Sequence, residues 1–224
     1  MLKGKKAVIF DMDGSLVDSM WIWPEVDRIY MEKYGLTQPE DFHKAIEGMS
    51  YTETAQYFVD TFRTLGRTVE EVKAEWQEMT MELYRTKVFP KPGAMEFLDN
   101  MKHSGVLLGI ATSNSRSLAE AALKAQGMIR YFDSVRTSCE VSAGKPAPDV
   151  YLKVAEDLCV RPAECLVFED VPNGIRAGKN AGMEVCAVDD LFSRRDEEEK
   201  KRLADYFIHD YFEIRDNTYE RCRG

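Results

Sequence analysis

The stretch Ala7-Val8-Ile9-Phe10-Asp11-Met12-Asp13-Gly14-Ser15 decides the fold of this 224-residue chain. Its first four residues form a short apolar run, which predicts a buried strand. The strand delivers two carboxylates, Asp11 and Asp13, to its carboxyl end, where open α/β sheets bind their ligands. Two aspartates at this spacing can act as a nucleophile and a nearby proton donor beside a hard cation. Asp and Gly are also common in strand-to-loop turns for conformational reasons, so this stretch alone does not settle the chemistry.

Composition limits the class of protein. The 44% hydrophobic content suffices for a packed interior, and the formal net charge of -9 argues against a surface that binds nucleic acid or an anionic membrane. No apolar stretch approaches the length of a membrane span, and the first residues lead into a strand without a signal-peptide apolar region, so we expect a cytoplasmic protein. The five cysteines are odd in number and lack a C-x-x-C pair, which favours buried, reduced thiols over disulfides or zinc.

A helical segment follows the aspartate loop, over about residues 19–87. A first helix is expected over Met20 to Tyr34, and capping boxes at Thr37, Ser50 and Thr68 predict three further helix starts. Apolar residues at helical spacing form two stripes, which indicate core packing rather than a ligand site. The stripes are Ala55, Phe58, Val59, Phe62 and Leu65, then Val69, Val72, Trp76, Met79 and Leu83. The segment is therefore predicted to be a self-packed helical bundle.

Strands and helices alternate after residue 88, where two prolines and a glycine in Val88–Gly93 suit a hinge. Strands are expected at 106–111, 134–137, 165–168 and 185–188, and helices at 94–103, 117–126, 149–158 and up to Asn180. Residues 205–208 suit an edge strand, and the tail over 216–224 is expected at the surface.

Three further motifs each follow a predicted strand or lie in a loop: Thr112-Ser113-Asn114, Gly144-Lys145-Pro146-Ala147-Pro148 and Phe168-Glu169-Asp170-Val171-Pro172-Asn173-Gly174. With Asp11-Met12-Asp13-Gly14-Ser15-Leu16, and in this order, they resemble the motif set of the haloacid dehalogenase superfamily of phosphotransferases. The resemblance is nearest to the β-phosphoglucomutase-like branch and covers nearly the whole chain.

The resemblance implies a fold of two parts. Residues 1–18 and 88–224 would form an α/β core with a doubly wound, Rossmann-like parallel sheet. Residues 19–87 would form a small inserted α-helical cap domain, which closes over the site and shapes the choice of substrate.

The resemblance also implies a role for each motif. Asp11 would be the nucleophile and Asp13 the general acid and base. Ser113 and the backbone N–H of Asn114 would bind the phosphoryl group, because a hydroxyl and free amides at a helix start offer donors to phosphate oxygens. These two residues would equally well cap that helix. Lys145 would neutralise the phosphoryl oxygens and the nucleophile.

Glu169 and Asp170 predict a metal site. At the end of their own strand they would repel Asp11 and Asp13 unless a cation lay between them. Mg²⁺ fits best, because it favours octahedral oxygen coordination with waters and few carboxylates. The resemblance implies that Asp11, the backbone carbonyl of Asp13 and Asp170 are ligands, with Glu169 binding directly or through water. Asp189-Asp190 belongs to no motif and is expected in an exposed turn.

The choice between phosphatase and mutase depends on the cap. The mutase branch carries a histidine where this chain has Trp23 and a phosphate-binding arginine where it has Tyr51. Both absences favour hydrolysis of a small phosphorylated metabolite, first a sugar or polyol monophosphate. Arg116, on the core, keeps part of a distal phosphate site, so a mutase is the alternative. Trp23 and Tyr51 suit stacking on a sugar face or a base, as well as core packing.

A third alternative is a non-catalytic protein that binds phosphometabolites; it would have lost Asp11 or Asp13, and both are present. His43, His103 and His209 share no metal spacing and lie outside every motif, so a catalytic histidine is not expected. The mixed charges of 194–202 suit a solvated helix face. The expected partner is the small metabolite, with no nucleic acid and no membrane, and nothing demands more than a monomer.

Overall fold

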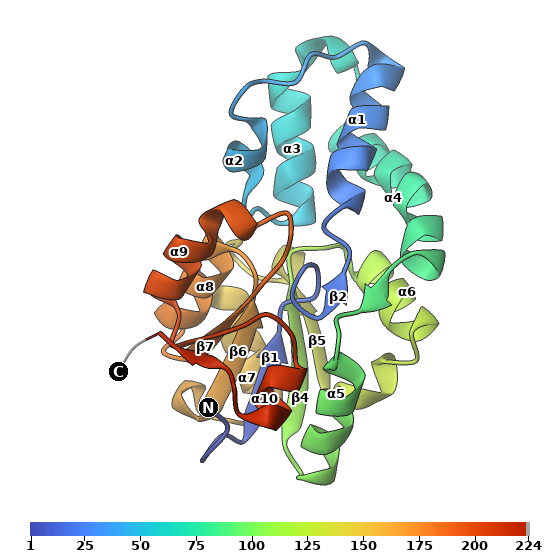
Figure 1. Cartoon of the computed structure of the whole chain (residues 1–224). Helices are drawn as coiled ribbons and strands as arrows, with labels where there is room; N and C mark the ends of the chain where they lie inside the picture. The colour runs from blue at the N-terminus through green and yellow to red at the C-terminus, as the bar shows by residue number, and fades with distance from the viewer. Residues whose placement is uncertain (223–224) are drawn as a thin grey trace.

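A parallel sheet forms the centre of the computed structural model, which describes residues 1–222 (Figure 1). Within that range the sheet has seven strands in the order β5-β4-β1-β6-β7-β8-β9, and β9 alone of these runs antiparallel to its neighbour. The strands are β1 (Ala7–Phe10), β4 (Leu107–Thr112), β5 (Ser134–Thr137), β6 (Cys165–Glu169), β7 (Glu184–Val188), β8 (Tyr206–Ile208) and β9 (Glu220–Arg221). When the parallel strands alone are numbered in chain order, their order across the sheet is 3-2-1-4-5-6. This is a doubly wound order, and its switch point lies between β1 and β6. The α/β fold class is therefore confirmed.

Helices cover both faces of the sheet. They are α5 (Ala94–His103), α6 (Arg116–Ala125), α7 (Asp149–Asp157), α8 (Pro172–Asn180), α9 (Glu197–Leu203) and α10 (Phe212–Asp216), with 3-10 turns at Ile129–Tyr131, Ser138–Glu140, Pro162–Glu164 and Arg194–Asp196. Val8 and Phe10 of β1 pack in one core with α5 and α6, whereas Ala7 and Ile9 pack in the other with α7 and α8. Because both faces of β1 are buried, its sequence is a continuous apolar run rather than an alternation.

Four helices stand over the carboxyl end of the sheet (Figure 1). They are α1 (Ile22–Tyr34), α2 (Phe42–Ile46), α3 (Tyr51–Thr61) and α4 (Val69–Thr86), with a 3-10 turn at Arg63–Leu65. A two-stranded antiparallel ribbon of β2 (Val17–Asp18) and β3 (Phe89–Pro90) carries both connections between these helices and the sheet. The division into domains at 1–18, 19–87 and 88–224 stays a prediction. We call α1 to α4 the cap.

Two of the three predicted capping boxes are confirmed. Ser50 and Thr68 each accept a hydrogen bond from the backbone N–H three residues later, and the glutamate at that position reaches back. The box at Thr37 is wrong, because the N–H of Phe42 bonds the carbonyl of Pro39 in a turn, and α2 starts only at Phe42. In α4 the buried residues are Val72, Trp76, Thr80 and Tyr84. The predicted stripe therefore holds at Val72 and Trp76, whereas Thr80 and Tyr84 are buried in place of Met79 and Leu83.

Several expected surface positions are buried instead. Asp190 is only 2% exposed because its carboxylate pairs with Lys91, at 2.6 Å. Lys200, within the run expected to be solvated, is fully buried, and its Nζ donates to the carbonyl of Val188 and to Ser193 Oγ. Residues 206–208 form an inner strand, since β9 lies outside them.

The tail and the thiols agree with the sequence in part. Glu220–Arg221 is exposed as expected, and the end of the predicted surface tail, residues 223–224, lies outside the described residues. Cys165 and Cys186 are buried as expected, but Cys139 and Cys159 are exposed. No helix within residues 1–222 has both the length and the apolar character needed to cross a membrane. The cytoplasmic location and the monomeric state stay predictions.

Candidate active site

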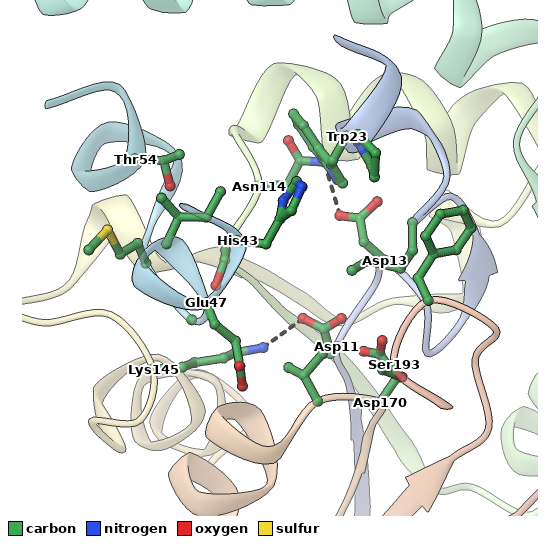
Figure 2. Close-up of a pocket in the computed structure, with 18 of the residues that line it drawn as sticks. Asp11, Asp13, Trp23, His43, Glu47, Thr54, Asn114, Lys145, Asp170 and Ser193 are labelled. Carbon is green, nitrogen blue, oxygen red and sulfur yellow. Dashed lines mark hydrogen bonds and ion pairs between the residues drawn. The ribbon is translucent and has the colours of Figure 1, made fainter. Parts of the chain in front are cut away.

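The site lies where the loops after β1, β4 and β6 meet beneath the cap. Because these strands are adjacent and parallel, their carboxyl ends bring Asp11, Asn114 and Asp170 to one edge of the sheet. A cavity of about 420 Å³ opens between this edge and the cap, and both sides contribute lining residues (Figure 2). The volume lies in the range of small-molecule sites.

Lys145 holds two of the acids together. Its Nζ donates to Asp11 Oδ1 and to Glu169 Oε1, each at 2.6 Å. Glu169 also accepts from the hydroxyl of Tyr151, at 2.5 Å, and from the backbone N–H of Asp170. Burial by itself lowers the pKa of Lys145, but the charges of Asp11 and Glu169 outweigh burial and hold that pKa above its usual value. Lys145 therefore stays protonated beside the acids, and the peptide bond that follows it is cis.

Three buried carboxylates fit a divalent cation. Asp11, Glu169 and Asp170 each offer an oxygen that lies within 4.8 Å of the others. Asp170 Oδ2 is buried without a hydrogen-bond partner in the described part of the chain. Burial, followed by repulsion among the acids, raises the pKa values of Asp11 and Asp170. Lys145 brings one positive charge to three acids, so a bound cation would balance the cluster and engage the orphaned oxygen.

Asp13 has different partners from Asp11. Its Oδ1 accepts hydrogen bonds from Ser19 Oγ and from the Tyr84 hydroxyl, each at 2.6 Å, and its Oδ2 accepts from Asn114 Nδ2 at 3.0 Å. Burial raises the pKa of Asp13, and the hydrogen bonds from these three side chains oppose that rise. The two aspartates of one loop thus occupy distinct environments, one ion-paired and one held by neutral donors.

The predicted phosphate-binding residues are placed at the cavity, with one difference. Ser113 and Asn114 both line it. The backbone N–H of Asn114, expected to face phosphate, donates instead to Thr112 Oγ1 at 3.0 Å. The carbonyl of Ser113 accepts the backbone N–H of Tyr51 at 2.8 Å, so the cap is docked on this loop.

The predicted substrate-contacting residues divide into two groups. Trp23 and Tyr51 line the cavity with ring centroids 6.2 Å apart, and the Tyr51 hydroxyl is engaged by the carbonyl of Lys73. Arg116 is not brought to the cavity. Its guanidinium lies in a separate surface hollow, paired with Glu140 at 2.5 Å and bonded to the carbonyl of Val135.

Other lining residues were not expected from the sequence. Asp27 and His43 line the cavity from the cap, although no catalytic histidine was expected. Ser19 and Tyr84 were not expected either, and they hold Asp13 by hydrogen bonds without lining the cavity. The sequence did carry a signal for Asp27, which lies one helical turn after Trp23 and so shares its face of α1.

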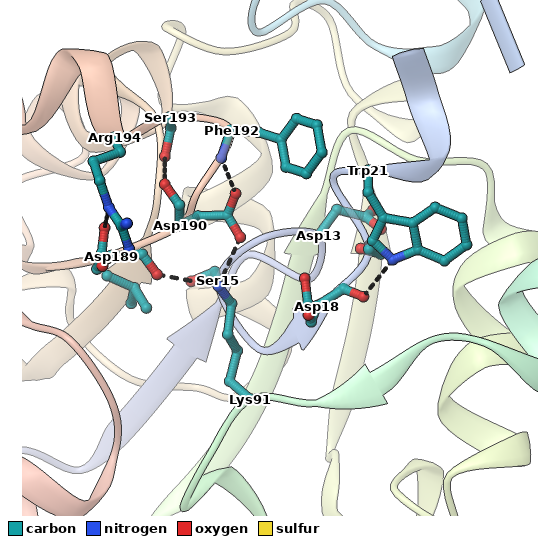
Figure 3. A network of polar contacts seen from close by, with 12 residues as sticks. Asp13, Ser15, Asp18, Trp21, Lys91, Asp189, Asp190, Phe192, Ser193 and Arg194 are labelled. Carbon is teal, nitrogen blue, oxygen red and sulfur yellow. Dashed lines mark hydrogen bonds and ion pairs between the residues drawn. The ribbon is translucent and has the colours of Figure 1, made fainter. Parts of the chain in front are cut away.

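The loop after β7 also reaches the cavity, through Phe192 and Ser193. Figure 3 shows how it is held: Lys91 Nζ donates to Asp190 Oδ2 at 2.6 Å, and Asp190 Oδ1 accepts the backbone N–H of Phe192 at 2.9 Å. The buried acid thus shapes the wall of the site rather than facing solvent.

Comparisons with known proteins agree with this arrangement. A family model described as haloacid dehalogenase-like hydrolase matches residues 8–188. A phosphorylated carbohydrates phosphatase of Thermotoga maritima is 34% identical over 179 residues, which cover 80% of this chain and 82% of the relative. Hexitol phosphatase A of Escherichia coli is 34% identical over 188 residues, 82% of each chain.

Solved structures show the same fold. CbbY from Rhodobacter sphaeroides in complex with phosphate superposes with a TM-score of 0.80 at 21% identity, covering 94% of this chain and 96% of the other. A β-phosphoglucomutase from Clostridium difficile superposes with a TM-score of 0.78 at 20% identity, covering 96% and 97%.

Proposed function

This chain belongs to the haloacid dehalogenase-like hydrolases and is a phosphatase of that family, and from this premise we propose that it hydrolyses sugar or polyol monophosphates through an aspartyl-phosphate intermediate. One observation carries the mechanism. Asp11 and Asp13 share a loop at the end of the central strand, but Lys145 pairs with Asp11 whereas neutral donors hold Asp13. Such a pair of environments separates a nucleophile from an acid and base.

Asp11 attacks phosphorus in line with the leaving oxygen. A bond forms between a carboxylate oxygen of Asp11 and phosphorus while the bond to the leaving oxygen breaks. Asp13, whose pKa burial raises, gives its proton to that oxygen. Asp13 then takes a proton from water, which attacks the aspartyl phosphate and releases inorganic phosphate and Asp11.

Positive charge and donors at the phosphoryl group support both steps. Lys145 lies at the nucleophile, and Ser113, which carries a hydroxyl, lines the same cavity. Asp11, Asp170 and the backbone carbonyl of Asp13 would hold Mg²⁺, with Glu169 binding directly or through water. The ion, when bound, supplies charge that stabilises the phosphoryl oxygens.

The substrate class rests on relatives and on cavity composition. Two of the relatives that match at least 80% of this chain are named for phosphorylated carbohydrates and for hexitols. The cap side of the cavity offers the aromatic rings of Trp23, Tyr51 and Trp76, which suit the apolar face of a sugar.

A mutase is the alternative, and two observations weigh against it. Trp23 and Tyr51 stand where the mutase branch has basic residues. Arg116, which was to bind a distal phosphate, is neutralised by Glu140 outside the cavity. A bisphosphate would therefore lack a cationic anchor at these positions.

The test measures phosphate release from a panel of sugar, polyol and nucleotide monophosphates with Mg²⁺. An Asp11→Asn variant is the control, and a coupled assay follows conversion of β-glucose 1-phosphate to glucose 6-phosphate. Release from sugar or polyol phosphates that vanishes in the control supports the proposal. Isomerisation that outpaces release and needs a bisphosphate primer would contradict it, as would no release from any substrate.

A further inference from the structure

A buried acid without a partner lies in the cap wall of the cavity. Asp27, on α1, lines the cavity with 6% of its surface exposed. Within residues 1–222, no hydrogen bond or ion pair engages its side chain. Burial alone raises the pKa of Asp27 to about 7, because no charged group of the described chain lies close enough to oppose or add to it.

The other acids of α1 make the contrast plain. Glu25 and Glu32 are exposed, and both pair with Arg28 at 2.9 Å. The buried acid is thus the one left unpaired, although a carboxylate out of water is the group that most needs a partner. Backbone donors do not help, since Asp27 lies beyond the first turn of its helix, where N–H groups bond within the helix. A ligand in the cavity can supply the missing donors.

The surroundings define which donors fit. Trp23 precedes Asp27 by one turn on the same helix face, and Trp76 lines the same cavity. Hydrogen bonds donated by a ligand favour the ionised form of Asp27, which only accepts hydrogen bonds and can accept from two neighbouring hydroxyls at once. The aromatic faces of Trp23 and Trp76 suit the C–H surface of a carbon chain that carries such hydroxyls.

The charge on the cap side of the cavity argues against an anionic group there. Glu47 also lines the cavity. Arg195 lines it too, but Asp196 is paired with it at 3.5 Å, and the Arg195 side chain is 69% exposed. A second phosphate or a carboxylate placed next to Asp27 would meet an uncompensated like charge.

We propose that Asp27 selects substrates by accepting hydrogen bonds from hydroxyl groups at their non-phosphorylated end. Asp27 thereby favours neutral polyhydroxylated monophosphates over those that carry a second anion. This inference rests on the proposed function and adds the residue that recognises the hydroxyl groups of the substrate.

The first experiment compares turnover of three substrates: sorbitol 6-phosphate, phosphoglycolate and p-nitrophenyl phosphate. The variants are Asp27→Leu and Asp27→Asn, and the matched control is Asp60→Asn, an exposed acid on α3 of the same cap. In Asp27→Leu, kcat/KM for sorbitol 6-phosphate relative to p-nitrophenyl phosphate should fall about 10- to 100-fold, since charge-assisted hydrogen bonds are lost. Asp27→Asn should raise the relative kcat/KM for phosphoglycolate. The control should keep the wild-type ratios.

If both Asp27 variants keep the wild-type ratios of kcat/KM between the substrates, the inference is overturned, whereas the proposed phosphatase activity is not. A wild-type preference for glucosamine 6-phosphate over glucose 6-phosphate that Asp27→Asn removes would also overturn it, because Asp27 would then bind an amine.

A binding experiment keeps the inference testable if no substrate is turned over. Calorimetry measures the Kd of sorbitol 6-phosphate for Asp11→Asn and for the Asp11→Asn, Asp27→Leu double variant. We expect the double variant to bind at least about tenfold more weakly. Equal Kd values would overturn the role of Asp27, whereas absence of turnover by the wild type overturns only the proposed hydrolysis. Asp27→Leu replaces an unpaired buried acid by an apolar side chain, so it should fold at least as well as the wild type.

Discussion

Tyr84 connects the cap to Asp13, the acid of the proposed mechanism. It lies near the end of α4, is fully buried, and donates its hydroxyl to Asp13 Oδ1 while accepting from Asn114 Nδ2 at 3.0 Å. The same carboxylate oxygen also accepts from Ser19. Tyr84 therefore acts as a positioning residue, because it fixes the direction of Asp13 without facing the phosphoryl group itself.

Replacement of Tyr84 by Phe should lower kcat about tenfold and change KM less, since the acid would be misdirected while substrate binding is kept. Steady-state kinetics on the best substrate would measure both constants. Tyr57→Phe is the control, because Tyr57 is also an aromatic residue of the cap and is only partly buried. A higher KM with an unchanged kcat would contradict this role, because it would show that Tyr84 binds substrate rather than orienting Asp13.

Asp27 should also set a pH dependence of stability. Its folded pKa, near 7, lies above its unfolded value of 3.8, so its contribution to stability is complete below about pH 4 and is lost as the pH rises through 7. Asp27→Asn should therefore melt at the same temperature as the wild type or lower near pH 4. Relative to the wild type, the free energy of unfolding of Asp27→Asn should rise between pH 4 and 8 by on the order of 4 kcal/mol. Thermal melts across this range measure the difference, and a difference that is flat with pH would contradict the prediction.

At the scale of elements, α8 is placed by a close approach to the end of β6. Gly174, in the first turn of α8, lies so near Glu169 that any Cβ would collide with the Glu169 carboxylate. That carboxylate is bonded to Lys145 and Tyr151. The helix can therefore pack on the site only with a glycine at this position.

Gly174→Ala should lower kcat/KM at least about tenfold, because Glu169 and with it Lys145 must move away from Asp11. Gly35→Ala is the control for general destabilisation. Gly35 ends α1 with a φ of 61° and has open space around its Cα, so alanine there should cost about 1 kcal/mol of stability and leave turnover unchanged. Chemical denaturation and kinetics on both variants separate the two effects. Full activity in Gly174→Ala would contradict the role given to this contact.

At the scale of the whole molecule, cap and core meet around the cavity through polar contacts. The N–H of Tyr51 bonds the carbonyl of Ser113, and Asn173 Nδ2 bonds the carbonyl of Glu47 at 3.1 Å. Tyr84 adds the contact to Asp13. The buried acids therefore lie beneath a docked cap, where unbalanced charge is unfavourable because burial removes part of its solvation.

Mg²⁺ should stabilise the folded chain. At about 100 times its Kd the ion would add about 2.7 kcal/mol, or about 5 to 10 °C in melting temperature for a chain of this size. Asp170→Asn should melt higher than the wild type in a metal chelator, because it removes one repelling acid, and should lose most of the Mg²⁺-dependent shift. Asp60→Asn should keep the shift. Equal shifts in Asp170→Asn and the wild type would place the ion elsewhere.

The sequence by itself determined most of the elements and the residues to which we assign the chemistry. The strand at Ser134–Thr137 has the predicted bounds, and the capping boxes at Ser50 and Thr68 form as expected. Asp11 and Asp170 were predicted to meet because parallel strands present their carboxyl ends at one edge. These features depend on neighbours within a few residues or on the topology of the sheet, and both leave a pattern in the chain.

Tertiary structure alone decided which side chains meet across the cavity. Tyr84 reaches Asp13 over 71 residues of sequence, and Arg116 is drawn to Glu140 rather than to a phosphate. Asp27 shares a face of α1 with Trp23, but that spacing alone did not mark it as buried, since an acid on a helix is ordinarily solvated. Packing of the cap on the sheet buries it and removes its water, and no local pattern records which face of a helix another domain will cover. The residues of the proposed catalytic chemistry could therefore be predicted from short motifs, whereas the residue proposed to select the substrate was identified only from the fold.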